Sequence, residues 1–233
     1  MAGVPAERER VLLLHGIAAG PRSLRRLERA LGDEGYDTVN PAIPTRRLPI
    51  EALAAWIAAR NDPLFRPDSP LTHIVTSSMG GLVARVLIAA HRPPRLGRVM
   101  TIAPPHHGSE IADLLSGFAL YHRMFGPVGS QLKTDPPPGL TDRLGRVDYP
   151  LGVIAGDRAV DPLAWLLIPG PSDGRVSVAS TRLAGMADHA TIHATHVAMM
   201  RNPRAIALTL HFLRHGRFSA SHADTLDAAP GLC

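Results

Sequence analysis

The sequence predicts an α/β domain built on a mostly parallel sheet of about six strands, with helices on both faces. The main observation is that short apolar runs of strand length alternate with amphipathic stretches of helical length along the chain. In addition, the 233 residues are 45% hydrophobic and 19% charged, which is enough apolar surface for the core of one domain. No internal repeat interrupts the alternation.

The first part of the chain contains two of these strand–helix pairs. The continuous apolar run 11–14 predicts a strand buried on both faces. Leucines that recur on one face predict a helix over 21–31, which Gly32 ends. The segment 36–40 predicts a short second strand. Helical spacing of apolar residues predicts the next helix over 49–57, with the proline as its first residue.

The middle of the chain repeats this order. A β-branched run predicts a strand at 72–76, and the stretch 82–90, apolar on nearly every side, predicts a buried helix. A fourth strand is expected at 98–103. Helix-like sequence follows over 110–121.

The last third of the chain begins with a long connection. Residues 126–149 are rich in Gly, Pro and Asp, so we expect them to be irregular. Strands are expected at 151–155 and 190–194, with a further loop between them. The amphipathic stretch 203–215 predicts a closing helix. The domain is therefore expected over 10–218, between an N-terminal extension (1–9) and a small, polar, poorly ordered tail (219–233).

Composition limits the function classes that fit. The net charge is +5, but all basic residues except Lys133 are arginines, they are scattered, and aromatic residues make up only 4% of the chain, so no nucleic-acid partner is expected. No apolar run approaches the roughly 20 residues of a membrane span, and the N-terminus lacks a signal-peptide core. The single cysteine, Cys233, allows no intrachain disulfide, which favours a cytoplasmic location. Nothing in the sequence indicates an oligomeric state.

The most informative segment is the turn after the third expected strand. The run 74–76 stops at Ser78, and Gly80 and Gly81 precede the buried helix. Such a strand–turn–helix exposes a serine hydroxyl above the sheet, beside the backbone N–H groups of the first helical turn. Ser78 is therefore the candidate nucleophile, although an ordinary strand-to-helix turn has the same pattern.

The usual signature of this turn is Gly-x-Ser-x-Gly, and here Thr76 replaces the first glycine. Threonine is bulkier but still compact. The run Ser-Met-Gly-Gly sets the register, so Ser77 fills the position before the nucleophile.

A nucleophilic serine needs donors for the developing oxyanion. The His15-Gly16 turn after the first strand is expected to place the backbone N–H of Ile17 near the nucleophile, and the N–H of Met79 is the second donor. A plain turn between strand and helix is the alternative. The loop 104–109, after the fourth strand, is expected to shape the site rather than to react.

A general base and an orienting acid complete such a site. His196, after the last expected strand, is the best base, and His193 is the alternative. Asp173, in the turn Ser-Asp-Gly, is favoured as the acid over Asp157, which also follows a strand but lies farther from His196 in sequence. A metal site formed with His189 would need a helix here, whereas the alternation of residues indicates a strand, so no metal is expected.

Together these motifs resemble the bacterial α/β-hydrolase superfamily, on its lipase and esterase side. The resemblance covers approximately residues 10–218. It rests on the serine turn, on the Ser-Asp-Gly turn and on His196 ahead of the closing helix, together with Leu13-Leu14-His15-Gly16 and Pro105-His106-His107-Gly108-Ser109. It implies a minimal sheet of about six strands, because the chain begins at what would be the third strand of the full fold.

The resemblance implies ester hydrolysis by a Ser78–His196–Asp173 triad, through an acyl-enzyme and without a cofactor. The expected substrate is a small-molecule ester or a lipid. Residues 110–149 could form a partial cap, in which Phe118, Tyr121 and Phe125, together with His15, would contact the substrate. A thioesterase or amidase with the same triad, or a ligand-binding module without catalysis, remains the alternative.

Overall fold

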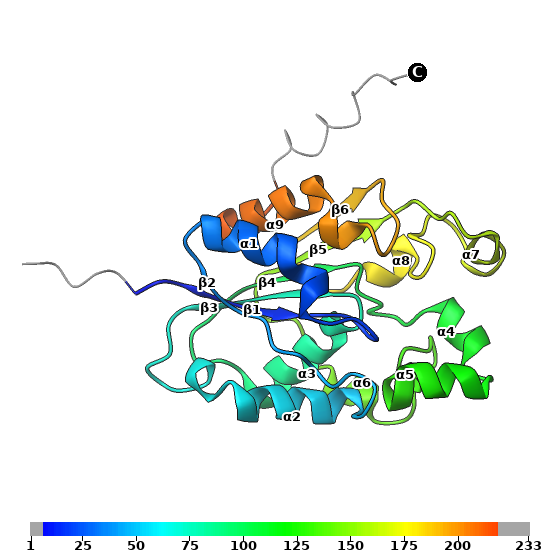
Figure 1. Cartoon of the computed structure of the whole chain (residues 1–233), viewed down its shortest axis with the longest axis horizontal. Coiled ribbons are helices and arrows are strands. Elements are labelled where there is room, and N and C mark those ends of the chain that lie inside the picture. The colour runs from blue at the N-terminus through cyan, green and yellow to red at the C-terminus, as the bar shows by residue number, and fades with distance from the viewer. Residues whose placement is uncertain (1–6, 219–233) are drawn as a thin grey trace, which may run out of the picture.

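The computed structural model of the chain describes residues 7–218. Its sheet has six strands, and every neighbouring pair is parallel, in the order β2-β1-β3-β4-β5-β6 (Figure 1). The expected parallel sheet is thus confirmed. The strands are β1 (Arg10–Leu14), β2 (Asp37–Val39), β3 (Thr72–Ser77), β4 (Leu96–Ile102), β5 (Leu151–Gly156) and β6 (Asp188–Ile192).

Helices cover both faces of this sheet, as the sequence predicts (Figure 1). Successive strand residues point to opposite faces. Leu12 and Leu14 therefore pack on one side with α2 (Ile50–Arg60), α3 (Gly80–His91) and α6 (Leu140–Arg143). Val11 and Leu13 pack on the other side with α1 (Arg25–Asp33) and α9 (Pro203–His215).

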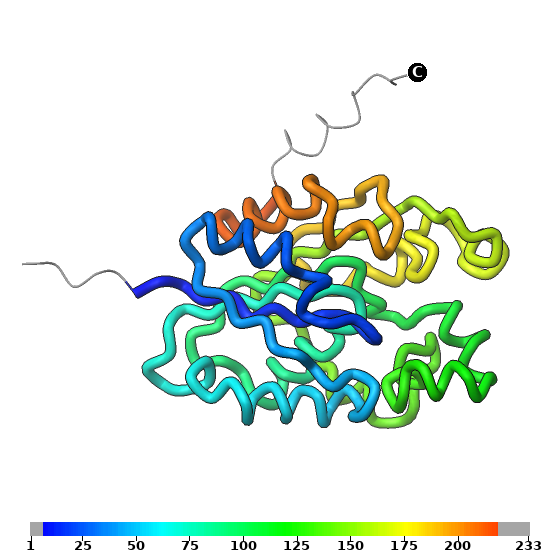
Figure 2. The backbone as a smooth tube through the Cα atoms, in the orientation of Figure 1, coloured from blue at the N-terminus to red at the C-terminus, as the bar shows by residue number. Residues whose placement is uncertain are grey.

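Four further helices lie beyond the carboxyl ends of the strands (Figures 1 and 2). They are α4 (Glu110–Leu115), α5 (Ala119–Gln131), α7 (Pro162–Leu167) and α8 (Val178–Thr181), and short 3-10 turns occur at Pro21–Leu24, Asp62–Leu64 and Met199–Arg201. Much of the chain between β4 and β6 therefore lies beyond the carboxyl ends of the strands.

The connection between β4 and β5 differs from the prediction. The single helix expected over 110–121 is two helices, α4 and α5, and α5 continues through Gly126 and Pro127 to Gln131. The segment 126–149 is accordingly not wholly irregular. The reason is a tertiary contact: Gly126, at φ +62, kinks the chain within α5, and a Cβ there would lie 2.1 Å from the carbonyl oxygen of Arg46, so packing requires a glycine at the kink.

Two other details differ from the prediction. Pro49 caps α2 instead of forming its first residue. Helices α7 and α8, of six and four residues, lie in a stretch that was expected to be a loop, because helices this short carry no periodic signal.

The strand order creates a topological switch point at the carboxyl ends of β1 and β3. The chain leaves β1 toward β2 on one side and then returns to form β3 on the other side. The loops that follow these two strands therefore diverge to opposite faces, and ligands bind at such switch points in open parallel sheets. The registers align the ends of the strands, with Leu14 opposite Thr76 and Thr76 opposite Thr101.

Of the two terminal segments expected at 1–9 and 219–233, all but residues 7–9 lie outside the described residues. Between Glu7 and Phe218, no helix combines the length and the apolar composition needed to cross a membrane.

The core side of α9 gives the first testable prediction. Phe212 is fully buried and lies against Gly152, where a Cβ would meet its ring at 2.8 Å. Replacing it by alanine (F212A) is expected to lower the free energy of unfolding by about 3–5 kcal/mol, because the cavity cannot close fully. Urea denaturation measures this change. The matched variant F118A removes a side chain that is 59% exposed and should change it by less than about 0.5 kcal/mol.

Candidate active site

Ser78 lies at the sharp turn between β3 and α3, at φ +52, a conformation that is uncommon outside glycine. The turn is tight because backbone approaches backbone. A Cβ on Gly80 would lie 2.4 Å from the carbonyl oxygen of Leu14, and a Cβ on Gly81 would lie 2.9 Å from the Cβ of Pro104. The two glycines after the serine are therefore required by space.

Thr76, which replaces the first glycine of the usual signature, does not prevent this turn. Thr76 is still within β3 and fully buried. Gly16, from the loop after β1, lies close to the serine, and a Cβ there would be 3.1 Å from the Cβ of Ser78. The small residue that the serine turn requires is thus Gly16, in the loop after β1, and not the residue at position 76.

Three side chains that are far apart in the sequence form one chain of hydrogen bonds. Ser78 Oγ lies 3.0 Å from Nε2 of His196. Nδ1 of the same ring lies 2.7 Å from Oδ2 of Asp173. The Asp173 side chain is 1% exposed and that of His196 18% exposed. The structure therefore brings together the three residues that the sequence analysis selected as nucleophile, base and acid.

The Asp173 carboxylate is held in place by its own turn. Its Oδ1 accepts hydrogen bonds from the backbone N–H groups of Arg175 (2.9 Å) and Val176 (2.8 Å). The backbone N–H of His196 donates to the carbonyl of Asp173 at 2.9 Å. This leaves Oδ2 for the imidazole, so both the carboxylate and the ring are fixed before any substrate arrives.

Asp157 and His193, the alternative acid and the alternative base, form a separate pair. Oδ1 of Asp157 lies 2.9 Å from Nδ1 of His193, and the His193 side chain is 67% exposed. His189 is bonded to the hydroxyl of Thr181 at 2.9 Å. The three histidines around β6 thus have three different partners and do not converge on one point.

The expected oxyanion donors lie in the two loops that meet at Ser78. Ile17 follows Gly16, and Met79 follows the serine directly. Among residues 7–218, neither N–H has a protein acceptor, whereas the N–H of Ser78 is bonded to the carbonyl of Ile102 at 2.8 Å. Both groups are therefore available to a ligand atom.

His15 does not lie where a substrate contact was expected. Its side chain is buried, and burial lowers the pKa of the imidazole. Nδ1 lies 2.9 Å from the carbonyl oxygen of Gly16, and Nε2 accepts from the N–H of Ile43 at 3.0 Å. Because both ring nitrogens are used by backbone groups, His15 positions the loop that carries Ile17 instead of contacting substrate.

The aromatic residues of the expected cap have different surroundings. Phe118 is 59% exposed, whereas Tyr121 is buried and its hydroxyl donates to the carbonyl of Gly129 at 3.2 Å. Phe125 is partly buried, and its ring centroid lies 4.7 Å from that of Tyr121. Helices α4 and α5 lie beyond the carboxyl ends of the strands (Figure 1), and Ser78 directly follows β3, but Tyr121 supports α5 from inside and presents little surface to a ligand.

The loop after β4 braces the acid turn, which the sequence did not indicate. The Ser109 hydroxyl donates to the carbonyl of Arg175, and the Ser180 hydroxyl donates to the carbonyl of Gly108, both at 2.6 Å. Ser180 lies on α8, a helix too short to be expected, so no sequence signal could have identified it.

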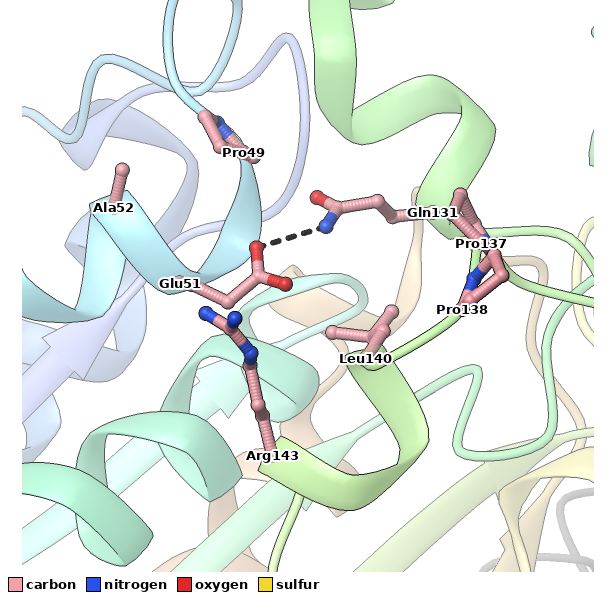
Figure 3. Close-up of a pocket in the computed structure, with 8 residues that line it drawn as sticks. All are labelled: Pro49, Glu51, Ala52, Gln131, Pro137, Pro138, Leu140 and Arg143. Carbon is pink, nitrogen blue, oxygen red and sulfur yellow. Dashed lines mark hydrogen bonds between the residues drawn. The ribbon is translucent and has the colours of Figure 1, made fainter.

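A cavity of about 600 Å³ lies away from these residues, between α2, α5 and α6. In it, the Gln131 amide donates to Glu51 at 2.8 Å while Arg143 points toward them (Figure 3). Gln131 also accepts from the N–H of Ile50 at 2.8 Å, so it joins the end of α5 to the start of α2. None of the residues that line this cavity belongs to the Ser78 site.

His106, in the loop after β4, generates a prediction about acid stability. It is 5% exposed, and burial, with smaller contributions from the charges of Arg85 and His107, lowers its pKa to about 3. The unfolded chain takes up this proton near the ordinary value of 6.5, so the free energy of unfolding should fall as the pH drops from 6.5 toward 3. The variant H106L should remove on the order of 2 kcal/mol of the loss between pH 7 and pH 5.

Urea denaturation of both proteins at the two pH values measures this difference. Equal pH dependence of H106L and the parent chain would contradict a buried neutral imidazole.

Comparison with solved structures finds bacterial lipases among the similar chains. The mature lipase BlEst2 of Bacillus licheniformis has a TM-score of 0.74 and 19% identity, over 90% of this chain and 93% of that chain. Phospholipase PlaB from Legionella pneumophila has a TM-score of 0.68 and 17% identity, over 94% of this chain and 62% of that chain. EstA from Clostridium botulinum has a TM-score of 0.64 and 11% identity, over 92% and 88% of the two chains.

No protein-family model matches the sequence, and no curated protein matches it either. At identities this low, structural likeness establishes the fold and not the activity. The six-stranded parallel sheet, covered on both faces and similar over nearly its whole length to that of BlEst2, is the α/β-hydrolase fold.

Proposed function

We propose that the chain is a serine hydrolase that cleaves carboxylic esters through an acyl-enzyme. The observation that carries this proposal is the continuous hydrogen-bonded chain from Ser78 Oγ through His196 to the buried carboxylate of Asp173. The nucleophile lies at a turn with a positive φ, where the hydroxyl is presented above the sheet. The similar bacterial lipases support the same class of reaction.

The geometry assigns a role to each group. Nε2 of His196 takes the proton as Ser78 Oγ attacks the ester carbonyl, and Asp173 orients the ring and stabilises its cation. The N–H groups of Ile17 and Met79 hold the oxyanion. Collapse of this intermediate expels the alcohol, protonated by His196, and water then cleaves the acyl-enzyme by the same steps in reverse order. These steps need no metal or organic cofactor.

Exposed apolar side chains around the site support an ester with an apolar acyl group. The large hydrophobic residues that are exposed among residues 7–218 all lie in segments that follow β4, β5 or β6 at the carboxyl edge. Apolar surface gathered in this way favours binding of apolar ligands. These residues are Leu114, Phe118, Leu120, Met124, Val160, Leu163, Trp165, Leu166 and Val197.

Replacing the nucleophile tests the proposal directly. S78A should lose essentially all hydrolysis of p-nitrophenyl esters and all labelling by a fluorophosphonate, while its unfolding free energy stays within about 1 kcal/mol of the parent chain. S77A, the matched control, removes the neighbouring hydroxyl and should keep both activities. Labelling that survives in S78A and disappears in S77A would show that the register is wrong.

The two aspartates can be separated by the same assay. D173N should lower kcat on the order of 10³-fold or more, because the imidazole loses its orienting anion and takes the wrong tautomer. D157N changes a carboxylate bonded to His193, and kcat should stay within about threefold of the parent value. Initial rates of p-nitrophenyl acetate hydrolysis measure both, and a larger loss in D157N would contradict the assignment.

The cap residues should affect the choice of acyl chain. We propose that Phe118 and Phe125 provide apolar surface to longer acyl groups. The double variant F118A/F125A should lower kcat/KM for p-nitrophenyl octanoate by about tenfold more than for the acetate, because the buried apolar area shrinks. A panel of esters of rising chain length measures the ratio. An unchanged ratio would remove the cap from the substrate site.

A further inference from the structure

A second cavity has a composition that suits a ligand and lies outside the proposed triad. Its volume is about 320 Å³, at the lower end for small-molecule sites. It is formed by the loop after β5, by α7, by the residues before Asp173 and by the end of β6. Neither Ser78 nor His196 lines it, so it is not the acyl site.

One side of this cavity is apolar and held rigidly. The Trp165 side chain is 66% exposed, but its indole N–H donates to the carbonyl of Ala159 at 3.0 Å. The bond fixes the ring and satisfies its polar atom, so what remains toward the cavity is apolar aromatic surface. Ile168, which is 4% exposed, adds apolar surface beside it.

The other side carries a cation that has no counter-ion. Arg158 lines the cavity and, within residues 7–218, makes no ion pair. Its neighbour Asp157 already has His193 as a partner, at 2.9 Å. The nearby Arg175 differs from Arg158, because it lies 3.7 Å from the Asp161 carboxylate. The guanidinium of Arg158 is therefore available to an anion from solution.

We propose that this cavity binds a small organic anion, whose planar apolar body lies against the indole of Trp165 and whose carboxylate or phosphate is held by Arg158. A guanidinium presents parallel N–H donors that match either group. The volume admits a single substituted ring. Because Ser172 lines the cavity and precedes Asp173, the ligand would lie next to the acid turn.

Fluorine NMR of the full chain with three probes tests the proposal. The probes are 4-fluorobenzoate, 4-fluorophenyl phosphate and the neutral 4-fluorobenzamide. At millimolar concentrations the anions should show line broadening that reports binding, and the amide should bind about tenfold more weakly, because it forms no charge-assisted pair. Tighter binding of the carboxylate or of the phosphate identifies which anion the site prefers, and either result supports the proposal.

Two variants test whether the probes bind in this cavity. R158Q should weaken binding of the anions about tenfold and leave the amide unchanged. W165A should weaken all three probes about five- to tenfold, because each loses its apolar face. R29Q and W56F are the matched controls, since both residues lie outside the cavity, and they should bind as the parent chain does. R158Q removes no ion pair of the described chain, so it remains informative even if W165A unfolds.

Equal binding of benzoate and benzamide, or anion binding that R158Q does not weaken, would overturn the proposal. No broadening by any probe would overturn it as well. Binding is measured without ester hydrolysis, so this result is independent of the triad. A chain that hydrolyses no ester and still binds the anions through Arg158 would contradict the proposed function alone.

Discussion

The close approach of the β1 loop to the serine turn is the constraint on which the rest of the site depends. The Leu14 carbonyl lies where a Cβ on Gly80 would be, and Gly16 lies against Ser78. Two backbones can come this near only when no side chain separates them. The parallel register then aligns the ends of β1 and β3, so that the hydroxyl and the two candidate oxyanion donors lie at the same end of the sheet.

Backbone strain also gathers around this serine turn, and a buried polar side chain helps to hold it. Among residues 7–218, the positive-φ residues other than glycine are Ala18, Ser78 and Ala103, each just beyond the carboxyl end of a strand. Such conformations cost of order 1–3 kcal/mol each and persist only where the surroundings hold them. The ring of His15 is part of that support, because it ties the loop after β1 to Ile43.

Two carboxylate–imidazole pairs lie side by side near the ends of β5 and β6, yet only one reaches the serine. Asp173 is buried and takes three hydrogen bonds through its two oxygens, whereas the Asp157–His193 pair faces solvent. Gly156 separates the two pairs, and its missing Cβ leaves room for that of Asp173. A pair that is desolvated and fixed by backbone donors can orient a base, while an exposed pair is free to face a ligand.

The sequence by itself determined the elements and the chemistry carried by single segments. Apolar runs and periodicity specified all six strands and the covering helices α1, α2, α3 and α9, but not the short α6, and the small residues around Ser78 specified the serine turn, because these signals are local. Only the tertiary structure decided what depends on distant contacts. It separated Asp173 from Asp157, turned His15 inward, divided the helix expected over 110–121, and bound Ser109 to the acid turn and Ser180 to the loop after β4. Those outcomes depend on which backbones and side chains contact one another across the sheet, and the spacing of residues along the chain does not determine these contacts.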